Sequence, residues 1–539
     1  MPKIKANKKI VLEIIGKKVS DSELYEIIPY LGTDLESIGN EFIEVEIFPN
    51  RPDMLSSEGL GRALKSFIHG KNFSKNYVCK KSDYEVLVDN SVLEVRPKTV
   101  CAVIKGINID DAALERIIDL QEKLHITHCR NRKKAAIGVY DLDKIDFPIS
   151  YKALPLKAIS FKPLGSKKIM NGLQILKETD VGKKYSHLVK GNNSAAFEDA
   201  SGNILSMPPI VNSDNCGNVS SNSKNLFIEV SGFDNKVLEE ALNILVTSIL
   251  DIGGECYEVT VKDDSGQKTY PDLSSHSMKV SSSYINKVSG LDLDDASIRK
   301  CLGSMGIDYS KGEAIIPCYR ADFLHPIDVV EDCIIGYGYR NIEGLSNPVF
   351  TKGKLSDIEI LKHKLRDYLV GFGLIETISY NLADSSLQGK YFDDVVRLKN
   401  SLSERHDSLR RSLIFSSFDT LKENRKNVYP QSFFELGKVF FGSESDCLGI
   451  SKAGEGMDYM SVKVLLDNIV DYLGLKSDIS LEISKYDFFI EGRQADIMLG
   501  EHKVGYLGEV SIDLIRNIGI DFPLAFLQLD LDLLLENLK

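Results

Sequence analysis

The stretch IPCYRADFLHPIDVVEDCIIGYGYRNI, residues 316–342, decides how the middle of this chain folds. Pro326 is tolerated in the first turn of a helix, and the apolar residues after it recur at helical spacing. The stretch therefore predicts a helix that begins near Pro326. Four carboxylates lie around its first turn, where acids so close together repel one another. They belong to Asp322, Asp328, Glu331 and Asp332.

The four carboxylates allow two interpretations. Hard oxygen ligands gathered in this way suit a magnesium ion, which keeps several waters and needs only a few carboxylates. Acids at a helix N-terminus also complement the helix macrodipole, by about 0.3 to 1 kcal/mol each. The spacing alone leaves both interpretations open.

Length and composition bound the class of protein. A chain of 539 residues is too long for one core, so several domains are expected. Hydrophobic residues make up 43% and charged residues 27%, and the sequence contains no apolar run long enough to span a bilayer. The N-terminus lacks the features of a signal peptide, so the expected location is cytoplasmic.

Cysteine spacing and net charge exclude some classes of site. Nine cysteines are scattered without a CxxC pair, which argues against a zinc ribbon and against a secreted disulfide framework. The net charge of -12 disfavours attraction of the whole surface to nucleic acid, although local basic patches such as CRNRKK at 129–134 could contact a phosphate backbone. If RNA is a partner, we expect only part of the chain to face it.

The order of predicted strands and helices divides the chain into four regions of a multidomain α+β protein. Residues 10–14 are expected to form a strand in the first region, and residues 524–534 the final strand of the last. A polar run at 262–275 predicts a linker or an edge strand. The regions are a small α+β domain (1–86), a mixed α/β domain (87–266), a compact unit with short helices (270–346) and a strand-rich remainder (350–539).

Several possible motifs carry little weight. His125, His128 and Cys129 could hold zinc, but no second ligand pair follows at a suitable distance. The glycines of GYGYRNIEG follow a predicted helix rather than a strand, which excludes a dinucleotide fingerprint. The sequence also contains neither GxSxG nor GxxxxGK[ST], and nothing in it resembles a catalytic triad.

The stretch CRNRKKAAIGVYDLDKI places cations and carboxylates at opposite ends of one predicted strand. Such a strand could line a polar pocket, or it could follow an ordinary solvated basic loop, and the sequence alone favours neither. The cations are Arg130, Arg132, Lys133 and Lys134, and the carboxylates are Asp141 and Asp143.

Seven segments occur in a fixed order along nearly the whole chain. FPNRPDMLSSEGLGRAL, RKKAAIGVYDLDKI, MPPIVNS and YRADFLHPIDVVEDCIIGYGYRNI are followed by NSLSERHDSLRRSLI, FFELGKVF and EGRQADIMLGEHKVGYLGEV. Together they resemble the beta subunit of phenylalanyl-tRNA synthetase in its archaeal and eukaryotic form. The resemblance implies a small N-terminal α+β domain, a mixed α/β editing domain, a winged-helix-like metal-binding domain and a C-terminal class II synthetase-like module of antiparallel sheet and helices.

The resemblance bears on the acidic helix. In that family a helix of the winged-helix-like domain carries magnesium ligands spaced D-x5-D-x2-E-[ED], close to the interface with the alpha subunit. The resemblance implies that Mg²⁺ is held here by Asp322, Asp328, Glu331 and Asp332.

The resemblance also implies an editing pocket within residues 87–266, which hydrolyses tyrosine mistakenly attached to the phenylalanine tRNA. An apolar pocket rejects an added hydroxyl poorly, so a second site that recognises the hydroxyl by hydrogen bonds improves fidelity. The residues expected in the pocket region are Arg130, Arg132, Gly138, Asp141, Pro208, Pro209 and Asn212.

The C-terminal region resembles a class II catalytic module that has lost its chemistry. A working site places an Arg two residues before a Glu to hold the ATP phosphate, and here that position is Phe433. Arg516 lies too far beyond the glycine-rich segment to replace the second arginine. The resemblance therefore implies that the alpha subunit binds most of the ATP, and we assign no cofactor-binding residue to this chain.

These expectations combine into one functional hypothesis. The chain is expected to be a structural and editing subunit of a cytoplasmic alpha2beta2 phenylalanine–tRNA ligase, whose partners are the alpha subunit and the phenylalanine tRNA. A free-standing RNA-binding or trans-editing protein, and a metal-dependent hydrolase that uses the 322–332 cluster, remain alternatives.

Overall fold

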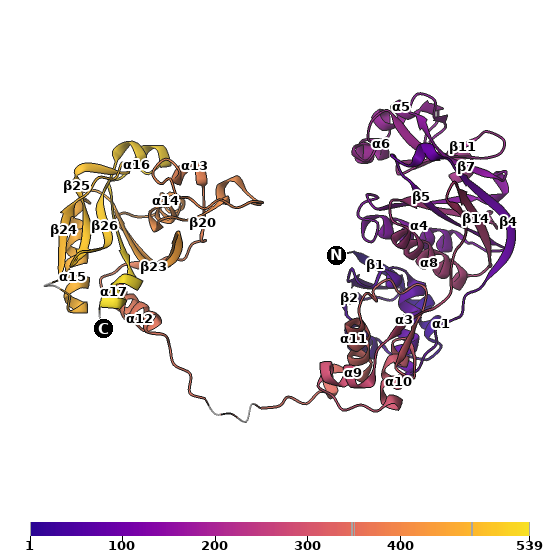
Figure 1. Ribbon diagram of the computed structural model, residues 1–539, viewed down its shortest axis with the longest axis horizontal. Coiled ribbons are helices and arrows are strands. Elements are labelled where there is room, and N and C mark those ends of the chain that lie inside the picture. The colour runs from indigo at the N-terminus through magenta and orange to yellow at the C-terminus, as the bar shows by residue number, and fades with distance from the viewer. Residues whose placement is uncertain (1, 347–348, 350, 476–477, 538–539) are drawn as a thin grey trace. The chain divides into compact units, whose positions relative to one another are not determined.

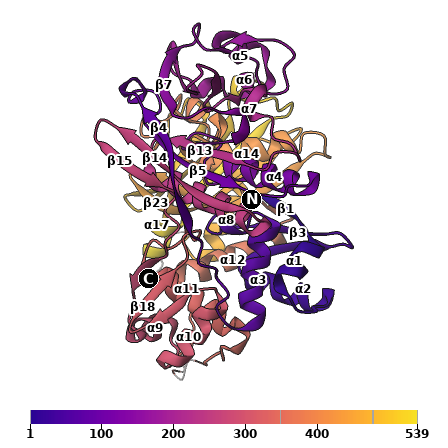
Figure 2. The ribbon, with the colours of Figure 1, turned by 90° about the vertical axis from the view of Figure 1, so that its right-hand side faces the viewer.

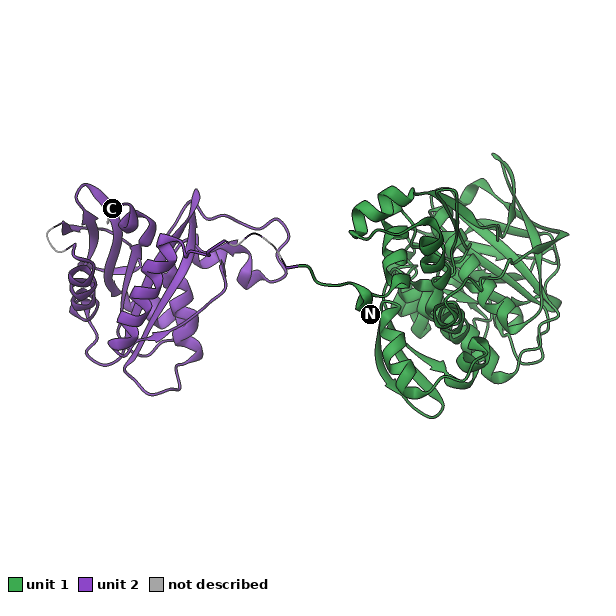
Figure 3. Ribbon diagram, turned by 90° about the horizontal axis from the view of Figure 1, so that it is seen from below, with its two compact units in different colours: residues 1–345 green, residues 346–539 purple. Residues whose placement is uncertain are grey.

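The computed structural model describes residues 2–346, 349, 351–475 and 478–537. It divides into two compact units, residues 1–345 and 346–539 (Figure 3). The expected start of the last region, residue 350, lies outside the described residues. Within the described ranges, no helix combines the length and the apolar character needed to cross a membrane.

Unit 1 begins with a three-stranded antiparallel sheet of order β1-β3-β2 and three helices. The strand expected at residues 10–14 is wrong, because these residues lie inside α1. The Asn7 side chain accepts a hydrogen bond from the Ile10 amide, and Gly16 ends the helix in the left-handed conformation, so local capping outweighs the strand preference of the β-branched residues. The elements are β1 (Lys3–Asn7), α1 (Lys8–Ile15), α2 (Asp21–Tyr30), β2 (Thr33–Ile38), β3 (Phe42–Ile47) and α3 (Ser57–His69).

A large mixed sheet forms the centre of unit 1. Its strand order is β12-β11-β10-β7-β4-β14-β5-β13-β6, and β15 pairs with β14 as an edge strand, as the polar run at 262–275 allowed. The strands are β4 (Cys79–Val88), β5 (Lys98–Lys105), β6 (Ala135–Asp141), β7 (Ile149–Pro155), β10 (Asn193–Glu198), β11 (Ile204–Met207), β12 (Val211–Asn212), β13 (Leu226–Gly232), β14 (Glu255–Asp263) and β15 (Gly266–Tyr270).

Two long helices and a short one accompany this sheet. They are α4 (Asp111–Ile126), α7 (Asp214–Gly217) and α8 (Asn235–Ile252). The apolar side of α8 is fully buried against β5 and β13. One end of the sheet carries a smaller substructure with its own apolar cluster, composed of β8 (Ser160–Phe161), β9 (Met170–Asn171), α5 (Gly172–Glu178) and α6 (Asp180–Tyr185).

The last part of unit 1 combines a small antiparallel sheet of order β16-β18-β17 with three helices. Figures 1 and 2 show these helices at the opposite end of unit 1 from α5 and α6. The elements are β16 (His276–Lys279), α9 (Ser282–Ser289), α10 (Asp295–Ser304), β17 (Asp308–Ser310), β18 (Glu313–Ile316) and α11 (Pro326–Tyr337), the helix predicted from the opening stretch.

Unit 2 is built on a seven-stranded sheet of order β19-β22-β23-β27-β26-β25-β24, antiparallel except for the β19–β22 pair. Apolar clusters cover both of its faces. The strands are β19 (Ile375–Glu376), β22 (Gln431–Phe441), β23 (Ser443–Ala453), β24 (Ile479–Ile483), β25 (Phe489–Leu499), β26 (His502–Val510) and β27 (Leu524–Asp530). The helices are α12 (Asp357–Gly371), α13 (Ser385–Gln388), α14 (Leu413–Glu423), α15 (Tyr459–Leu473), α16 (Ile512–Ile518) and α17 (Leu531–Asn537), and a separate pair joins β20 (Leu382–Ala383) to β21 (Ser408–Leu409).

The final strand expected at residues 524–534 ends four residues early. The Asp530 side chain accepts hydrogen bonds from the amides of Asp532 and Leu533, both at 3.1 Å. These bonds satisfy amides at the start of α17, so the alternating sequence LDLDLL continues as a helix.

Candidate functional site

A cavity of about 290 Å³ lies between α4, the edge strand β6 with its neighbour β13, and the loop around residues 208–212. Most of its wall is apolar and includes Ile117 and Ile137. A few polar side chains point into this apolar surface, which is the usual composition of a small-molecule site. They are Gln121, Glu122, His125, Arg132, Asn212, Asn218 and Glu229.

Glu229, on β13, is the most unusual group in the cavity wall. Only 2% of its surface is exposed, and its Oε1 accepts a hydrogen bond from the Tyr140 hydroxyl at 3.1 Å. Within the described residues, its Oε2 atom is buried and has no hydrogen-bond partner. Burial raises the pKa of Glu229 to about 8, although the hydroxyls of Tyr140 and Ser231 and the charge of Arg96 act in the opposite direction. The cavity therefore presents a carboxyl group with one hydrogen-bonding position unused.

Gly138 makes room for this carboxyl group. It lies directly opposite Glu229 in the register of β6 and β13. A Cβ atom at Gly138 would lie 2.6 Å from Oε1 of Glu229 and would also overlap the Tyr140 hydroxyl. Glycine is thus the residue that allows the carboxyl group and the phenol to share this position.

Arg132 ties α4 to the loop on the other side of the cavity. Its guanidinium donates to the carbonyl oxygens of Pro209 (3.2 Å) and Ile210 (2.9 Å) and to Oε1 of Glu122 (2.9 Å). The backbone of residues 130–132 has φ values of 48°, 53° and 63°, a left-handed run of three non-glycine residues. Such a conformation is strained and persists only where the surrounding contacts hold it.

His125 also fixes α4 against the sheet. Its Nε2 accepts a hydrogen bond from the Ile137 amide at 2.8 Å, and its Nδ1 lies 2.9 Å from Oε1 of Glu122. Burial lowers the pKa of His125, so the ring is neutral and Nδ1 donates to Glu122. Hydrogen bonds from His125 and Arg132 hold the pKa of Glu122 at about 2, against the opposing effect of partial burial.

Arg320 lies between two of the four carboxylates near the start of α11. Its Nε and Nη2 donate to Asp322 at 2.9 and 2.8 Å, and Nη2 also donates to Asp332 at 2.8 Å. Asp328 accepts from the amides of Leu324 and His325, both at 2.7 Å, and so serves the helix N-terminus. Glu331 is exposed.

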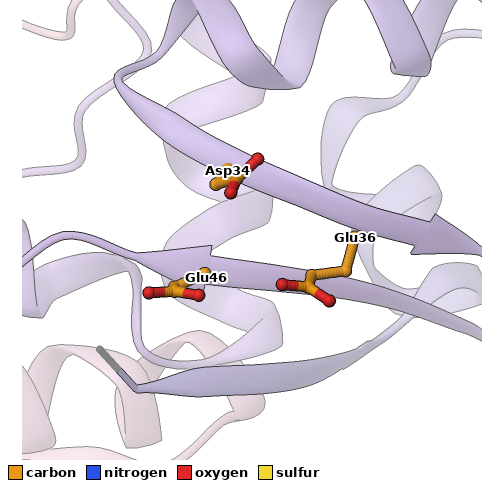
Figure 4. Close-up of side chains that lie close together, drawn as sticks. All are labelled: Asp34, Glu36 and Glu46. Atoms are coloured by element: carbon orange, nitrogen blue, oxygen red, sulfur yellow. The ribbon is translucent and has the colours of Figure 1, made fainter. Parts of the chain in front are cut away.

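These contacts provide a test of the magnesium interpretation. A buried guanidinium already neutralises two of the four carboxylates, and backbone amides engage a third. Among the described residues, three ligand atoms within 4.8 Å of one another occur instead at Asp34, Glu36 and Glu46, on β2 and β3 (Figure 4). As arranged in this chain, the carboxylates at 322–332 do not fit a magnesium ion held by this chain alone.

The trio on β2 and β3 has a cation beside it. Lys3 forms an ion pair with Glu36 at 2.7 Å, and this contact raises the pKa of Lys3. Asp34 and Glu36 are exposed to solvent, and Glu46 is half-buried. This is the usual arrangement of charged residues on a solvated sheet face.

In unit 2, Glu435 of β22 is held by a buried arginine. Arg410 donates to Oε1 of Glu435 at 2.6 Å, to Ser379 Oγ at 2.7 Å and to the Lys438 carbonyl oxygen at 2.7 Å. On the same sheet face an apolar cluster contains Phe433 together with Phe415, Phe488, Phe489, Tyr506 and Phe526. Aromatic side chains therefore fill much of the face on which Glu435 lies.

Curated relatives match almost the entire chain. The "Phenylalanine--tRNA ligase beta subunit" of Pyrococcus horikoshii is 33% identical over 547 residues, which cover 97% of this chain and 98% of the relative. The protein of the same name from Methanocaldococcus jannaschii is 33% identical over 560 residues, covering 99% of this chain and 100% of the relative. This chain belongs to the phenylalanine–tRNA ligase beta subunit family.

Two family models and one solved structure agree with this assignment. Residues 278–339 match the tRNA synthetase B5 domain, and residues 345–531 match the phenylalanyl tRNA synthetase beta chain CLM domain. An N-terminal fragment of the phenylalanyl-tRNA synthetase beta subunit from Pyrococcus horikoshii is 35% identical, with a TM-score of 0.59 over 63% of this chain and 100% of the fragment. The resemblance inferred from the ordered segments is thus confirmed.

The residues expected in the editing pocket of a beta subunit are only partly brought together. Arg132, Pro208, Pro209 and Asn212 line the cavity, and Gly138 lies behind Glu229. Arg130 is exposed and lies outside the cavity wall. Asp141, at the end of β6, instead accepts a hydrogen bond from Ser223 at 2.9 Å.

Glu229 and His125 were not assigned to the pocket from the sequence. Glu229 had a usable signal, since it is the one charged residue in the otherwise apolar strand LFIEVSG. His125 and His128 were considered as zinc ligands, but His125 binds Glu122 and a backbone amide, and His128 lies 3.2 Å from Glu240.

Proposed function

We propose that this chain proofreads tRNA within a phenylalanine–tRNA ligase, by hydrolysing tyrosyl-tRNA in the cavity beside Glu229. The observation that carries the proposal is the buried carboxyl group with an unpartnered Oε2 in a wall that is mostly apolar. Tyrosine differs from phenylalanine by one hydroxyl, and a hydroxyl is the group that a spare carboxyl oxygen can bind.

The preference for tyrosine over phenylalanine follows from the free-energy cost of burying a polar group without a hydrogen-bond partner. A tyrosyl side chain in the cavity would give the Glu229 carboxyl its missing hydrogen bond, whereas a phenylalanyl side chain would leave it buried and unpaired. Such a loss costs about 1 to 3 kcal/mol, or roughly tenfold to a hundredfold in relative binding. A site built around a substrate hydroxyl rejects the analogue that lacks it far better than an apolar pocket rejects an added hydroxyl.

The test compares Glu229→Gln with the matched control Glu198→Gln in the full chain co-expressed with an alpha subunit. Glu198 lies on β10 of the same sheet, where it pairs with Lys152 at 2.8 Å, and it does not line the cavity. We expect Glu229→Gln to slow deacylation of tyrosyl-tRNA by roughly tenfold to a hundredfold, with Glu198→Gln unchanged. Equal rates for tyrosyl-tRNA and phenylalanyl-tRNA in the unmodified complex would refute the proposal.

We further propose that amino-acid activation takes place on the alpha subunit of a cytoplasmic alpha2beta2 complex that uses ATP and Mg²⁺. Support comes from Phe433, which stands where a working class II site has its phosphate-binding arginine, and from the ion pair between Glu435 and Arg410. Because of this ion pair, the Glu435 carboxylate is already bound within the chain. The complex should exchange diphosphate into ATP in the presence of phenylalanine. Exchange by the full beta chain alone would refute this division of labour.

The assignment of Asp322, Asp328, Glu331 and Asp332 as magnesium ligands stays a proposal that requires ligands from the alpha subunit. Its support is the spacing of the four acids and the exposed position of Glu331. Titration calorimetry with Mg²⁺ should then show binding to the complex that Glu331→Gln weakens. Equal binding by the beta chain alone would contradict the shared site.

A further inference from the structure

A lysine-rich segment of unit 1 lies beside the cavity. Residues 156–190, named here the lysine cap, contain eight lysines against one glutamate and one aspartate, a formal charge of +6 in a chain of net charge -12. All eight lysines are exposed. The lysine cap is therefore strongly positive, whereas the chain as a whole is negative. The lysines are Lys157, Lys162, Lys167, Lys168, Lys177, Lys183, Lys184 and Lys190.

The lysine cap forms part of the cavity wall. Leu164, in the loop between β8 and β9, and Val181, on α6, both line the cavity and are both exposed on their outer side. Tyr185 of α6 lies against the guanidinium of Arg132, 4.6 Å from its ring centre. Figure 1 shows α5 and α6 together at the end of unit 1, next to β7 and β11. The cap is thus fixed to the cavity through Arg132.

Most of the charges in the cap lack an internal partner. Lys162 pairs with Asp214 at 2.6 Å and Lys168 with Glu178 at 3.0 Å. In the part of the chain that the structure describes, none of the other six lysines has a carboxylate within 4.0 Å. An external anion could bind them without displacing an ion pair of the protein.

Three of these six lysines are close in sequence to the wall residues. Lys183 and Lys184 follow Val181 on α6, and Lys167 follows Leu164 in the loop before β9. The cavity, at about 290 Å³, has room for an amino-acid side chain but not for a nucleic acid strand. A strand that delivers an aminoacyl group must therefore stay outside the cavity, and these lysines lie two or three residues along the chain from Leu164 and Val181 of its wall.

We propose that the lysine cap binds the phosphate backbone at the acceptor end of tRNA and so holds the aminoacylated 3′ terminus at the mouth of the cavity. This inference rests on the proposed editing function. Lysines bind phosphate as point charges without reading sequence, and a strand fixed at the rim raises the local concentration of its ester in the cavity. An acidic segment of a partner protein would suit the same charges, and the experiment separates the two.

The test compares two triple variants in the full chain co-expressed with an alpha subunit. The first, Lys167→Ala/Lys183→Ala/Lys184→Ala, named here the rim variant, removes unpaired charges close in sequence to the wall residues Leu164 and Val181. The matched control, Lys17→Ala/Lys18→Ala/Lys81→Ala, removes three exposed lysines, including an adjacent pair, that lie outside the lysine cap and far in sequence from every residue of the cavity wall. Binding of uncharged phenylalanine tRNA is measured by filter retention over a range of salt concentrations.

Each lost phosphate contact should reduce the slope of log affinity against log salt by about 0.7 to 0.9. We expect the rim variant to lose about 2 from this slope and to bind on the order of tenfold more weakly at low salt, with the control unchanged. An unchanged slope in the rim variant, or weaker association with the alpha subunit in place of weaker tRNA binding, would overturn the proposal.

A second measurement separates the cap from the cavity. Deacylation of tyrosyl-tRNA should show a roughly tenfold higher KM in the rim variant, while hydrolysis of a minimal ester, tyrosyl-adenosine, should not change because it carries no phosphate. An equal loss with both substrates would overturn the role of the cap. If the unmodified complex hydrolyses neither substrate, the editing function fails, and the salt dependence of tRNA binding still decides whether the cap contacts phosphate.

Discussion

Glu229 and Glu435 lie on inner strands of the two sheets, with 2% and 6% of their surfaces exposed, yet their partners and their surroundings differ. Glu435 is bound to the buried guanidinium of Arg410 and to Ser379. Among the described residues, Glu229 forms no ion pair, and its Oε2 has no partner. Beside Glu435 the sheet face is filled with aromatic side chains, whereas a cavity lies beside Glu229.

The difference separates a structural carboxylate from one that is available to a ligand. A buried carboxylate needs a partner, and Glu435 has acquired a permanent one from its own chain. Among the described residues Glu229 forms no ion pair, so burial outweighs the charge of Arg96 and raises its pKa to about 8, and a bound ligand can complete its hydrogen bonding. The two sheets therefore place the same side chain in opposite situations: Glu435 is paired within its own chain, and Glu229 faces a cavity as the proposed function requires.

The largest predicted effect is on the pH dependence of stability, and its absence would contradict the comparison of Glu229 with Glu435. Because burial raises the pKa of Glu229 from 4.5 to about 8, the folded chain binds the proton more tightly than the unfolded chain. The free energy of unfolding should then fall as the pH rises from about 4.5 to 8, by at most about 5 kcal/mol from this group. Glu229→Gln should remove this dependence and stabilise unit 1 at pH 8.

Urea unfolding of unit 1 at pH 5.5 and pH 8 measures this difference. Glu435→Gln is the matched control, since it leaves Arg410 buried without its carboxylate and should destabilise unit 2 at both pH values. If Glu229→Gln were no more stable than the unmodified chain at pH 8, the raised pKa of Glu229 would be wrong.

The second prediction concerns Arg410, the ion-pair partner of Glu435 in unit 2. Arg410→Met removes the cation and leaves Glu435 as an uncompensated buried charge, at a cost of about 3 to 5 kcal/mol in the free energy of unfolding. The double variant Arg410→Met/Glu435→Gln should recover much of this loss, because it removes the charge as well. Denaturant unfolding of unit 2 checks both variants, and equal stability of the single and double variants would contradict the structural role of the pair.

The sequence predicted long, periodic elements and ordered motifs well, because these depend on local spacing. α11 begins at Pro326 as its apolar spacing indicates, and the ordered segments identified the family. Two strand predictions failed because of local helix capping. Asn7 and Asp530 each cap the start of a helix within sequence whose alternation or β-branched residues favour a strand.

The partners of buried charges could not be predicted from the sequence. Arg320 lies only two residues before Asp322, but nothing in the spacing shows that its side chain turns toward Asp322 and Asp332 rather than solvent. Glu229 is separated from Tyr140 by 89 residues, and their contact depends on the pairing of β6 with β13. Such contacts require the three-dimensional pairing of distant strands, which residue patterns do not encode.

The smallest predicted effect concerns two glycines that lie beside the compared carboxylates. Gly138 lies against Glu229 and Tyr140, and Gly437 lies against Arg410 and Glu435, so a methyl group would overlap polar atoms at both positions. Each Gly→Ala change should therefore destabilise its own unit by about 1 to 3 kcal/mol, as overpacking does. Only Gly138→Ala should also slow deacylation of tyrosyl-tRNA, because only there does the displaced carboxyl group face a cavity. Thermal unfolding and deacylation are measured on both variants, and a similar loss of deacylation in Gly437→Ala would mean that the two carboxylates do not have separate roles.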